Sequence, residues 1–166
     1  MKRLRQYLGI LIALIAYYCI HEGAHLIYAL THGVFNQINL MALGVQVDVF
    51  RNQMTDAQLG WFCLVGPIAT FITAWVLVLF SKRICALTNK IVKAIFWYST
   101  LIFLLLDPLY LSILYHFVGG GDMNGIRLLL PEVIAAIAFG VILIAHIVVV
   151  WKVLWPRYTQ SFKEDN

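Results

Sequence analysis

Four long apolar stretches constrain this chain more than any other feature of its sequence. They cover about residues 7–30, 58–80, 91–118 and 132–155. Each is long enough to cross the hydrocarbon core of a bilayer as a helix, which takes about 20 residues. Because 62% of the residues are hydrophobic and only 12% are charged, the chain lies far outside the composition of soluble globular domains. The sequence therefore predicts an all-α polytopic membrane protein in which residues 1–166 form a single membrane-embedded domain.

The same composition excludes several functional classes. A soluble enzyme or a disordered tail contains many more polar residues than this chain does. The net charge of +4 is too scattered along the sequence to form a nucleic-acid-binding face. The three cysteines, Cys19, Cys63 and Cys85, have no CxxC spacing, which argues against a disulfide framework and against a thiolate zinc cluster. We therefore expect the lipid bilayer, and no nucleic acid, as a partner.

The distribution of lysine and arginine predicts the orientation, because loops rich in these residues stay in the cytoplasm. Ten of the twelve lie before the first stretch, between the second and third stretches or at the start of the third, or at or after the end of the fourth. The ten are Lys2, Arg3, Arg5, Lys82, Arg83, Lys90, Lys93, Lys152, Arg157 and Lys163, and the other two are Arg51 and Arg127. We expect a multi-pass protein of a plasma or inner membrane, with both termini cytoplasmic and segments 31–57 and 119–130 facing the exterior.

Two segments outside the four stretches carry further predictions. Residues 38–50 contain β-branched residues that alternate around Val47, with Gly44 as a candidate turn, and this pattern predicts a short β-hairpin. Such a hairpin can either clamp an extended substrate by edge pairing or cover a site as a structural element. The tail 159–166 is polar and is expected to fray.

The motif His21-Glu22-Gly23-Ala24-His25 stands late in the first stretch and reads HExxH. On a helix, residues i and i+4 share a face, so the imidazoles of His21 and His25 can bind one zinc ion. Glu22 would then stand where a general base takes a proton from zinc-bound water. The alternative is simple polar packing, but ionisable groups within an apolar span are costly and usually functional. The sequence therefore favours a Zn²⁺ site with Glu22 as the catalytic residue.

A third protein ligand is needed to complete such a site. Asp122 is one candidate, in the glycine-rich run 119–125, where the backbone can bend towards a partner. Asp107, in the third stretch, is the other candidate. His116 and His146 are weaker ones, because a single histidine in a span is more often a packing residue. From the residues alone, the choice between Asp122 and Asp107 stays open.

Three features together resemble the site-2 protease family of intramembrane zinc metalloproteases. They are the HEGAH motif within a span, Gly66-Pro67 in the next span, and an aspartate in a glycine loop before a later span. The resemblance covers most of residues 15–130. It implies that Asp122 is the third zinc ligand, at the position of the family's LDG-type motif. It also implies that Thr70 stands where the family's GPxxN motif has asparagine.

The chain departs from the family pattern in two further respects. The asparagine- and proline-rich run that precedes the LDG-type motif is missing, and Asp107-Pro108-Leu109 is its nearest remnant. The charge distribution also places the His25 end of the first stretch towards the exterior, whereas family members present zinc nearer the cytoplasm. The sequence thus predicts an inverted member with its active site towards the exterior.

The motif and the resemblance together predict a zinc-dependent intramembrane endopeptidase. It would hydrolyse peptide bonds within or next to the transmembrane segment of a membrane protein or peptide substrate. His21, His25 and Asp122 would hold Zn²⁺ and Glu22 would act as general base. Asn124 is a candidate for binding the substrate backbone or orienting Asp122, and a turn residue is the other interpretation. The alternative function is a non-proteolytic zinc-binding membrane protein, either in metal handling or as a regulatory relative.

Overall fold

The protein is a bundle of four long helical segments with a small β-hairpin after the first, seen in a computed structural model that describes residues 2–41 and 44–164. Within those residues, four segments are long and apolar enough to cross a membrane. They are Arg3–Thr31, Asp56–Cys85, Lys90–Val118 and Glu132–Lys163. The predicted fold class is therefore confirmed, and each predicted stretch lies inside one of these segments.

The first two segments are single helices, and the other two are each interrupted by a π-helical turn. The first half of the chain forms α1 (Lys2–Thr31), β1 (Phe35–Met41), β2 (Gly44–Val49), a 3₁₀ turn η1 (Arg51–Gln53) and α2 (Asp56–Cys85). The second half forms α3 (Lys90–Leu109), the π-helix η2 (Tyr110–Leu114), α4 (Tyr115–Val118), α5 (Met123–Ile126), α6 (Glu132–Val149), the π-helix η3 (Val150–Leu154) and α7 (Trp155–Glu164).

The helices extend beyond the predicted apolar stretches because polar residues cap them. Thr55 and Gln58 form a capping box that starts α2 at Asp56, and Lys82 and Arg83 occupy its last turn, where cations favour the helix dipole. The expectation of a frayed tail is wrong for the described part of it. Residues up to Glu164 continue α7, while residues 165–166 lie outside the described part of the chain.

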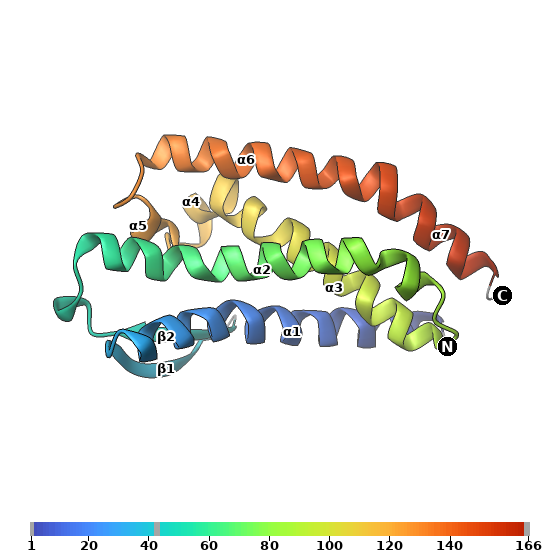
Figure 1. Ribbon diagram of the computed structural model, residues 1–166, viewed down its shortest axis with the longest axis horizontal. Helices are drawn as coiled ribbons and strands as arrows, with labels where there is room; N and C mark the ends of the chain where they lie inside the picture. The colour runs from blue at the N-terminus through green and yellow to red at the C-terminus, as the bar shows by residue number, and fades with distance from the viewer. Residues whose placement is uncertain (1, 42–43, 165–166) are drawn as a thin grey trace.

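Helices α1, α2 and α3 pack against one another, and α6 packs on α3 and η2 (Figure 1). Both termini lie at one end of the bundle, together with the α2–α3 connection (Figure 1). The hairpin and α5 lie at the other end (Figure 1). The termini and the α2–α3 connection thus share one end of the bundle, and which end faces the cytoplasm stays a prediction.

The predicted hairpin consists of β1 and β2, paired antiparallel with an irregularity between Phe35 and Gln37. Gly44, the predicted turn residue, is the first residue of β2, and the connecting residues 42–43 lie outside the described part of the chain. Gly44 has a φ of +145°, and a Cβ there would lie 2.5 Å from the Tyr18 ring of α1. Glycine at this position therefore lets the strand lie directly against α1.

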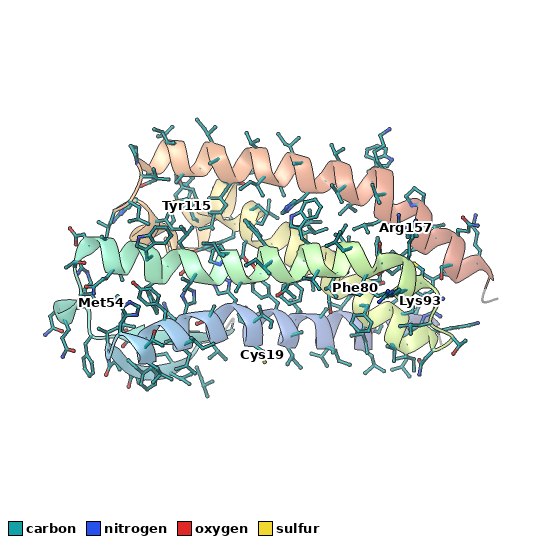
Figure 2. The ribbon with its side chains drawn as sticks, viewed as in Figure 1. Cys19, Met54, Phe80, Lys93, Tyr115 and Arg157 are labelled. Carbon is teal, nitrogen blue, oxygen red and sulfur yellow. The ribbon has the colours of Figure 1, made fainter. Side chains whose placement is uncertain are left out.

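Buried apolar residues form two clusters, one towards each end of the bundle. One includes Met54 and Tyr115 at the hairpin end, which Figure 2 labels. The other includes Tyr17, Trp97 and Tyr158 and packs α1, α2 and α3 against the start of α7. Along α1, His21 and His25 lie after Tyr18, which packs on the second cluster, and before Leu26, which packs on the first.

His146 compensates for a helical hydrogen bond that Pro108 removes from α3. Proline has no N–H, so Pro108 leaves the carbonyl of Leu104, four residues earlier, without its helical donor. The Nδ1 of His146, on α6, lies 2.6 Å from that carbonyl oxygen and donates to it. His146 is buried and its ring also contacts Phe71 and Trp75. His146 is therefore a helix-packing histidine, as its isolated occurrence suggests.

We expect His146→Leu to destabilise the fold by about 1–2 kcal/mol, because it leaves the Leu104 carbonyl buried without a donor. Unfolding of the purified protein in detergent, followed by circular dichroism, measures the change. His116→Leu, at an exposed position, is the matched control and should change the stability little. Equal stability of the two variants would contradict the role given to His146.

Candidate metal centre

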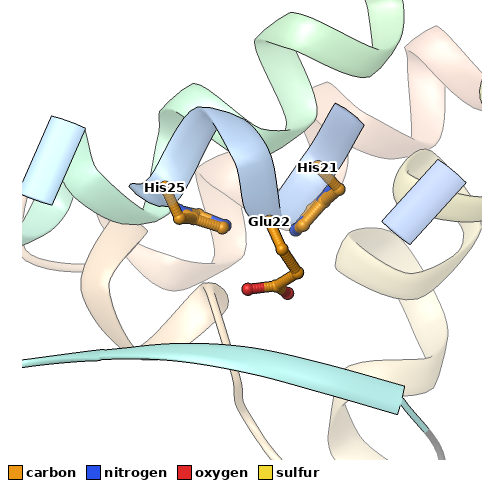
Figure 3. A group of neighbouring side chains, drawn as sticks. All are labelled: His21, Glu22 and His25. Carbon is orange, nitrogen blue, oxygen red and sulfur yellow. The ribbon is translucent and has the colours of Figure 1, made fainter. Parts of the chain in front are cut away.

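His21 and His25 lie one turn apart on α1 with Glu22 beside them (Figure 3). Ligand atoms of these three residues all lie within 4.8 Å of one another. Both histidines are buried, and Glu22 is half-buried. Because α1 is unbroken through this turn, the 3.6-residue repeat holds both rings on the face that packs on α2 and α3.

The Nδ1 atom of each histidine is turned towards a fixed acceptor. His25 Nδ1 lies 2.7 Å from the backbone carbonyl oxygen of Phe62 on α2. His21 Nδ1 lies 3.3 Å from a carboxylate oxygen of Asp107 on α3. A carbonyl oxygen can only accept, so His25 must carry its proton on Nδ1, and Asp107 favours the same tautomer in His21. Each neutral ring then presents an Nε2 lone pair.

Asp122, just before α5, lies on the Nε2 side of both rings. One of its carboxylate oxygens is 3.0 Å from His21 Nε2, and the other is 3.5 Å from His25 Nε2. Burial disfavours the ionised carboxylate, but the contacts with His21 and His25 outweigh this effect and hold the pKa of Asp122 well below its usual range. Two imidazole nitrogens and a carboxylate therefore lie close together, and a cation that replaced the protons on the Nε2 atoms would be stabilised by this arrangement.

Asp107 occupies a different place. Its carboxylate is buried and lies on the Nδ1 side of His21, away from the side that faces Asp122. It also accepts hydrogen bonds from the hydroxyls of Tyr17, at 2.5 Å, and Thr70. A carboxylate on the outer nitrogen of a ligating histidine orients the ring and raises its basicity. If a metal is bound between the two Nε2 atoms, Asp107 lies where an orienting carboxylate would stand and Asp122 lies where a third ligand would stand.

Gly66 on α2 lies directly beside the two histidines. A Cβ at this position would lie 2.5 Å from His25 Nε2 and 2.8 Å from His21 Nε2. The absence of a side chain at Gly66 therefore leaves room at the two nitrogens that face Asp122. The sequence offered Gly66-Pro67 as part of a family resemblance and did not reveal this close approach, because it depends on how α2 packs on α1.

Glu22 is tied to the hairpin. Its Oε2 accepts a hydrogen bond of 2.9 Å from the backbone N–H of Val47 on β2. This N–H therefore points away from β1, and the outer edge of β2 faces α1 at the motif. Neither the Val47 contact nor the Phe62 contact of His25 could be read from the sequence, since backbone atoms carry no sequence signal.

Asn124, predicted to bind the substrate, lies on α5 with an exposed side chain. Its amide lies against Gly120, where a Cβ would collide with it. Its role towards a substrate stays a prediction. His116 is exposed and its ring contacts that of Tyr115, so it lies outside the group formed by His21, His25 and Asp122.

Comparisons with known proteins identify no relative. No protein-family model, curated protein or solved structure matches the chain.

We expect Gly66→Ala to abolish zinc binding, because its methyl group would occupy the space beside both Nε2 atoms. Metal analysis of the purified protein measures the bound zinc. Gly23→Ala is the matched control, since a Cβ there meets nothing within 4 Å although Gly23 lies inside the motif. Zinc binding by Gly66→Ala at the wild-type level would contradict the position assigned to the metal.

Substitution of Asp122 and of Asp107 should have different effects on zinc affinity, because one is placed as a ligand and the other as an orienting residue. Asp122→Ala is expected to remove zinc, whereas Asp107→Asn should weaken binding by about 10- to 100-fold, as loss of an orienting carboxylate does. Competition with a zinc-selective chelator gives both affinities. If Asp122→Ala kept full zinc occupancy while Asp107→Asn lost it, the two roles would have to be exchanged.

Proposed function

We propose that this protein is a zinc-dependent intramembrane endopeptidase. The convergence of His21 Nε2, His25 Nε2 and the Asp122 carboxylate, with Glu22 one residue from a ligand, carries the proposal. Two histidines and a carboxylate form a donor set that zinc hydrolases use, with one position left for water. The proposal is also supported by the resemblance of HEGAH, Gly66-Pro67 and the Asp122 loop to the site-2 protease family.

The residues present fit zinc in two ways. The Nδ1 atom of each histidine faces an oxygen acceptor, the Phe62 carbonyl for His25 and the Asp107 carboxylate for His21. These acceptors favour the tautomer in which Nε2 is left to bind a metal. Gly66 leaves space at the Nε2 atoms of both histidines. Zinc at such a site acts as a Lewis acid on a carbonyl and lowers the pKa of water to about 7. The non-proteolytic alternative shares this metal site and differs from the protease in the role of Glu22.

Glu22 is positioned to act as the general base. Its Oε2 is held by the N–H of Val47, and its other oxygen is left to take a proton from the attacking water. The same carboxyl group would then pass this proton to the leaving amine. The hydrogen bond from β2 fixes the carboxylate on the side of the motif that the hairpin covers, which orients the base before any substrate is present.

The hairpin supports a substrate-binding role for the segment 38–50. A substrate must be extended for its peptide bonds to be attacked, and an extended chain can pair with the free edge of a strand. The outer edge of β2 lies against α1, and its Val47 N–H is bonded to Glu22, so a chain that paired there would displace this hydrogen bond and lie beside the base. The motif at residues 21–25 also lies in the second half of α1 (Lys2–Thr31), nearer to the hairpin than to the N-terminus, which supports an opening towards the predicted exterior.

Glu22→Gln should lower peptide cleavage by at least about 100-fold while zinc stays bound, because the amide cannot accept the proton from water. The measurement uses proteoliposomes with a pool of single-span peptides, and mass spectrometry detects the fragments. Glu132→Gln, at the start of α6, removes one carboxylate elsewhere and should keep the activity.

Two outcomes would overturn the proposal. Wild-type cleavage by Glu22→Gln would remove the general base from the mechanism. A zinc-loaded wild type that cleaves no peptide but moves zinc across the vesicle membrane, unaffected by Glu22→Gln, would favour the metal-handling alternative.

A further inference from the structure

A cavity of about 850 Å³ lies at the end of the bundle opposite to the hairpin, between α1, α3 and α7. Its walls come from the first turns of α1 and α3 and from the length of α7. Figure 2 labels Lys93 at this end of the molecule. The volume is within the range of pockets that hold small ligands, about 300–1,000 Å³. The metal-site residues line no part of it.

The cavity combines positive charge with an aromatic wall. Three cations line it, namely Arg5, Lys90 and Lys163, and none of its described lining residues is acidic. Trp97, Trp155 and Tyr158 form much of the apolar wall. Such aromatic side chains are typical of the level where lipid headgroups meet acyl chains. Charge and apolar surface are thus arranged for a molecule that has an anionic head and a hydrocarbon body.

The cations and the walls are held in place by contacts within the protein. The guanidinium group of Arg5 lies 5.0 Å from the centre of the Phe162 ring. Lys93 is buried beneath α7, and its ammonium group donates a 2.7 Å hydrogen bond to Ser161. Ser161 in turn donates to the carbonyl of Cys85. These bonds fix α7 to α2 and α3, so the cavity exists before a ligand binds.

From this arrangement we propose that the cavity binds one anionic phospholipid of the membrane leaflet at the end of the bundle that carries the termini. The phosphate lies by Arg5 and Lys163, and an acyl chain lies against Trp97 and Trp155. Basic pockets between membrane helices on the cytoplasmic side recognise lipid headgroups in this way. The charge complementarity favours a phospholipid over an apolar helix, which would leave Arg5 and Lys163 facing hydrocarbon. The proposal is independent of the proposed proteolysis.

The test places the purified protein in nanodiscs of equal parts palmitoyl-oleoyl phosphatidylglycerol and phosphatidylcholine. Native mass spectrometry then identifies the lipid that stays bound to the released chain. We expect one phosphatidylglycerol in preference to phosphatidylcholine. Arg5→Gln with Lys163→Gln should weaken this binding about 25-fold, because each basic residue near an anionic headgroup contributes a factor of about five.

Two further variants test the charge outside the cavity and the volume of the cavity separately. Arg83→Gln with Lys152→Gln removes the same charge outside the cavity and should keep the lipid. Thr159→Trp fills the cavity from α7 without a change of charge and should exclude the lipid. Circular dichroism of each variant verifies that the helices are intact.

Several results would overturn the proposal. They are equal retention of the two lipids by the wild type, an equal loss in Arg83→Gln with Lys152→Gln, or displacement of the lipid by inorganic phosphate, which would indicate a simple anion site. A second copy of the chain found in place of the lipid would assign the cavity to a dimer interface and would also overturn it.

Discussion

The buried carboxylate of Asp107 is the interaction on which the rest of the bundle depends. An ionisable group inside a membrane span is costly unless it is paired, and Asp107 is paired with groups from two other helices. Tyr17 and His21 reach it from α1, and Thr70 reaches it from α2. A slip of either helix by one residue would remove these partners. The hydrogen bonds therefore fix the register of α1, α2 and α3, and the position of His21 follows from that register.

Glycine and proline complete this arrangement by shaping the backbone of the spans. Gly66 lets α2 approach α1 so closely that any side chain there would meet both histidines. Pro108 removes one helical donor from α3, and His146 supplies another from α6. The membrane offers no water to satisfy a freed carbonyl, so each irregularity needs a side-chain partner. These pairings attach the fourth span to the three helices that form the site.

Much of the fold and part of the site could be predicted from the sequence. Hydropathy locates the four spans because bilayer thickness sets a minimum length, and β-branched alternation locates the hairpin. The i, i+4 spacing of His21 and His25 predicts that they share a face. The separate positions of Asp122 and Asp107 could not be predicted, because they depend on which ring nitrogen of His21 each one meets. The contacts of His25 with Phe62 and of Glu22 with Val47 involve backbone atoms, so no residue type indicates them.

The depth of the proposed metal site follows from the geometry of α1 alone. A helix rises about 1.5 Å per residue, so His21 lies about 24 Å along the axis from Arg5, and His25 lies about 30 Å from it. The hydrocarbon core of a bilayer is about 30 Å thick. With Arg5 at the level of one set of headgroups, the two histidines lie close to the opposite surface. Water then has only a short distance to travel to Glu22, and it arrives from the side on which the hairpin lies. The helix that begins beside the cations Arg5 and Lys163 of the cavity thus places His21 and His25 near the opposite surface of the membrane. The lysine and arginine distribution predicts that this surface is the exterior one.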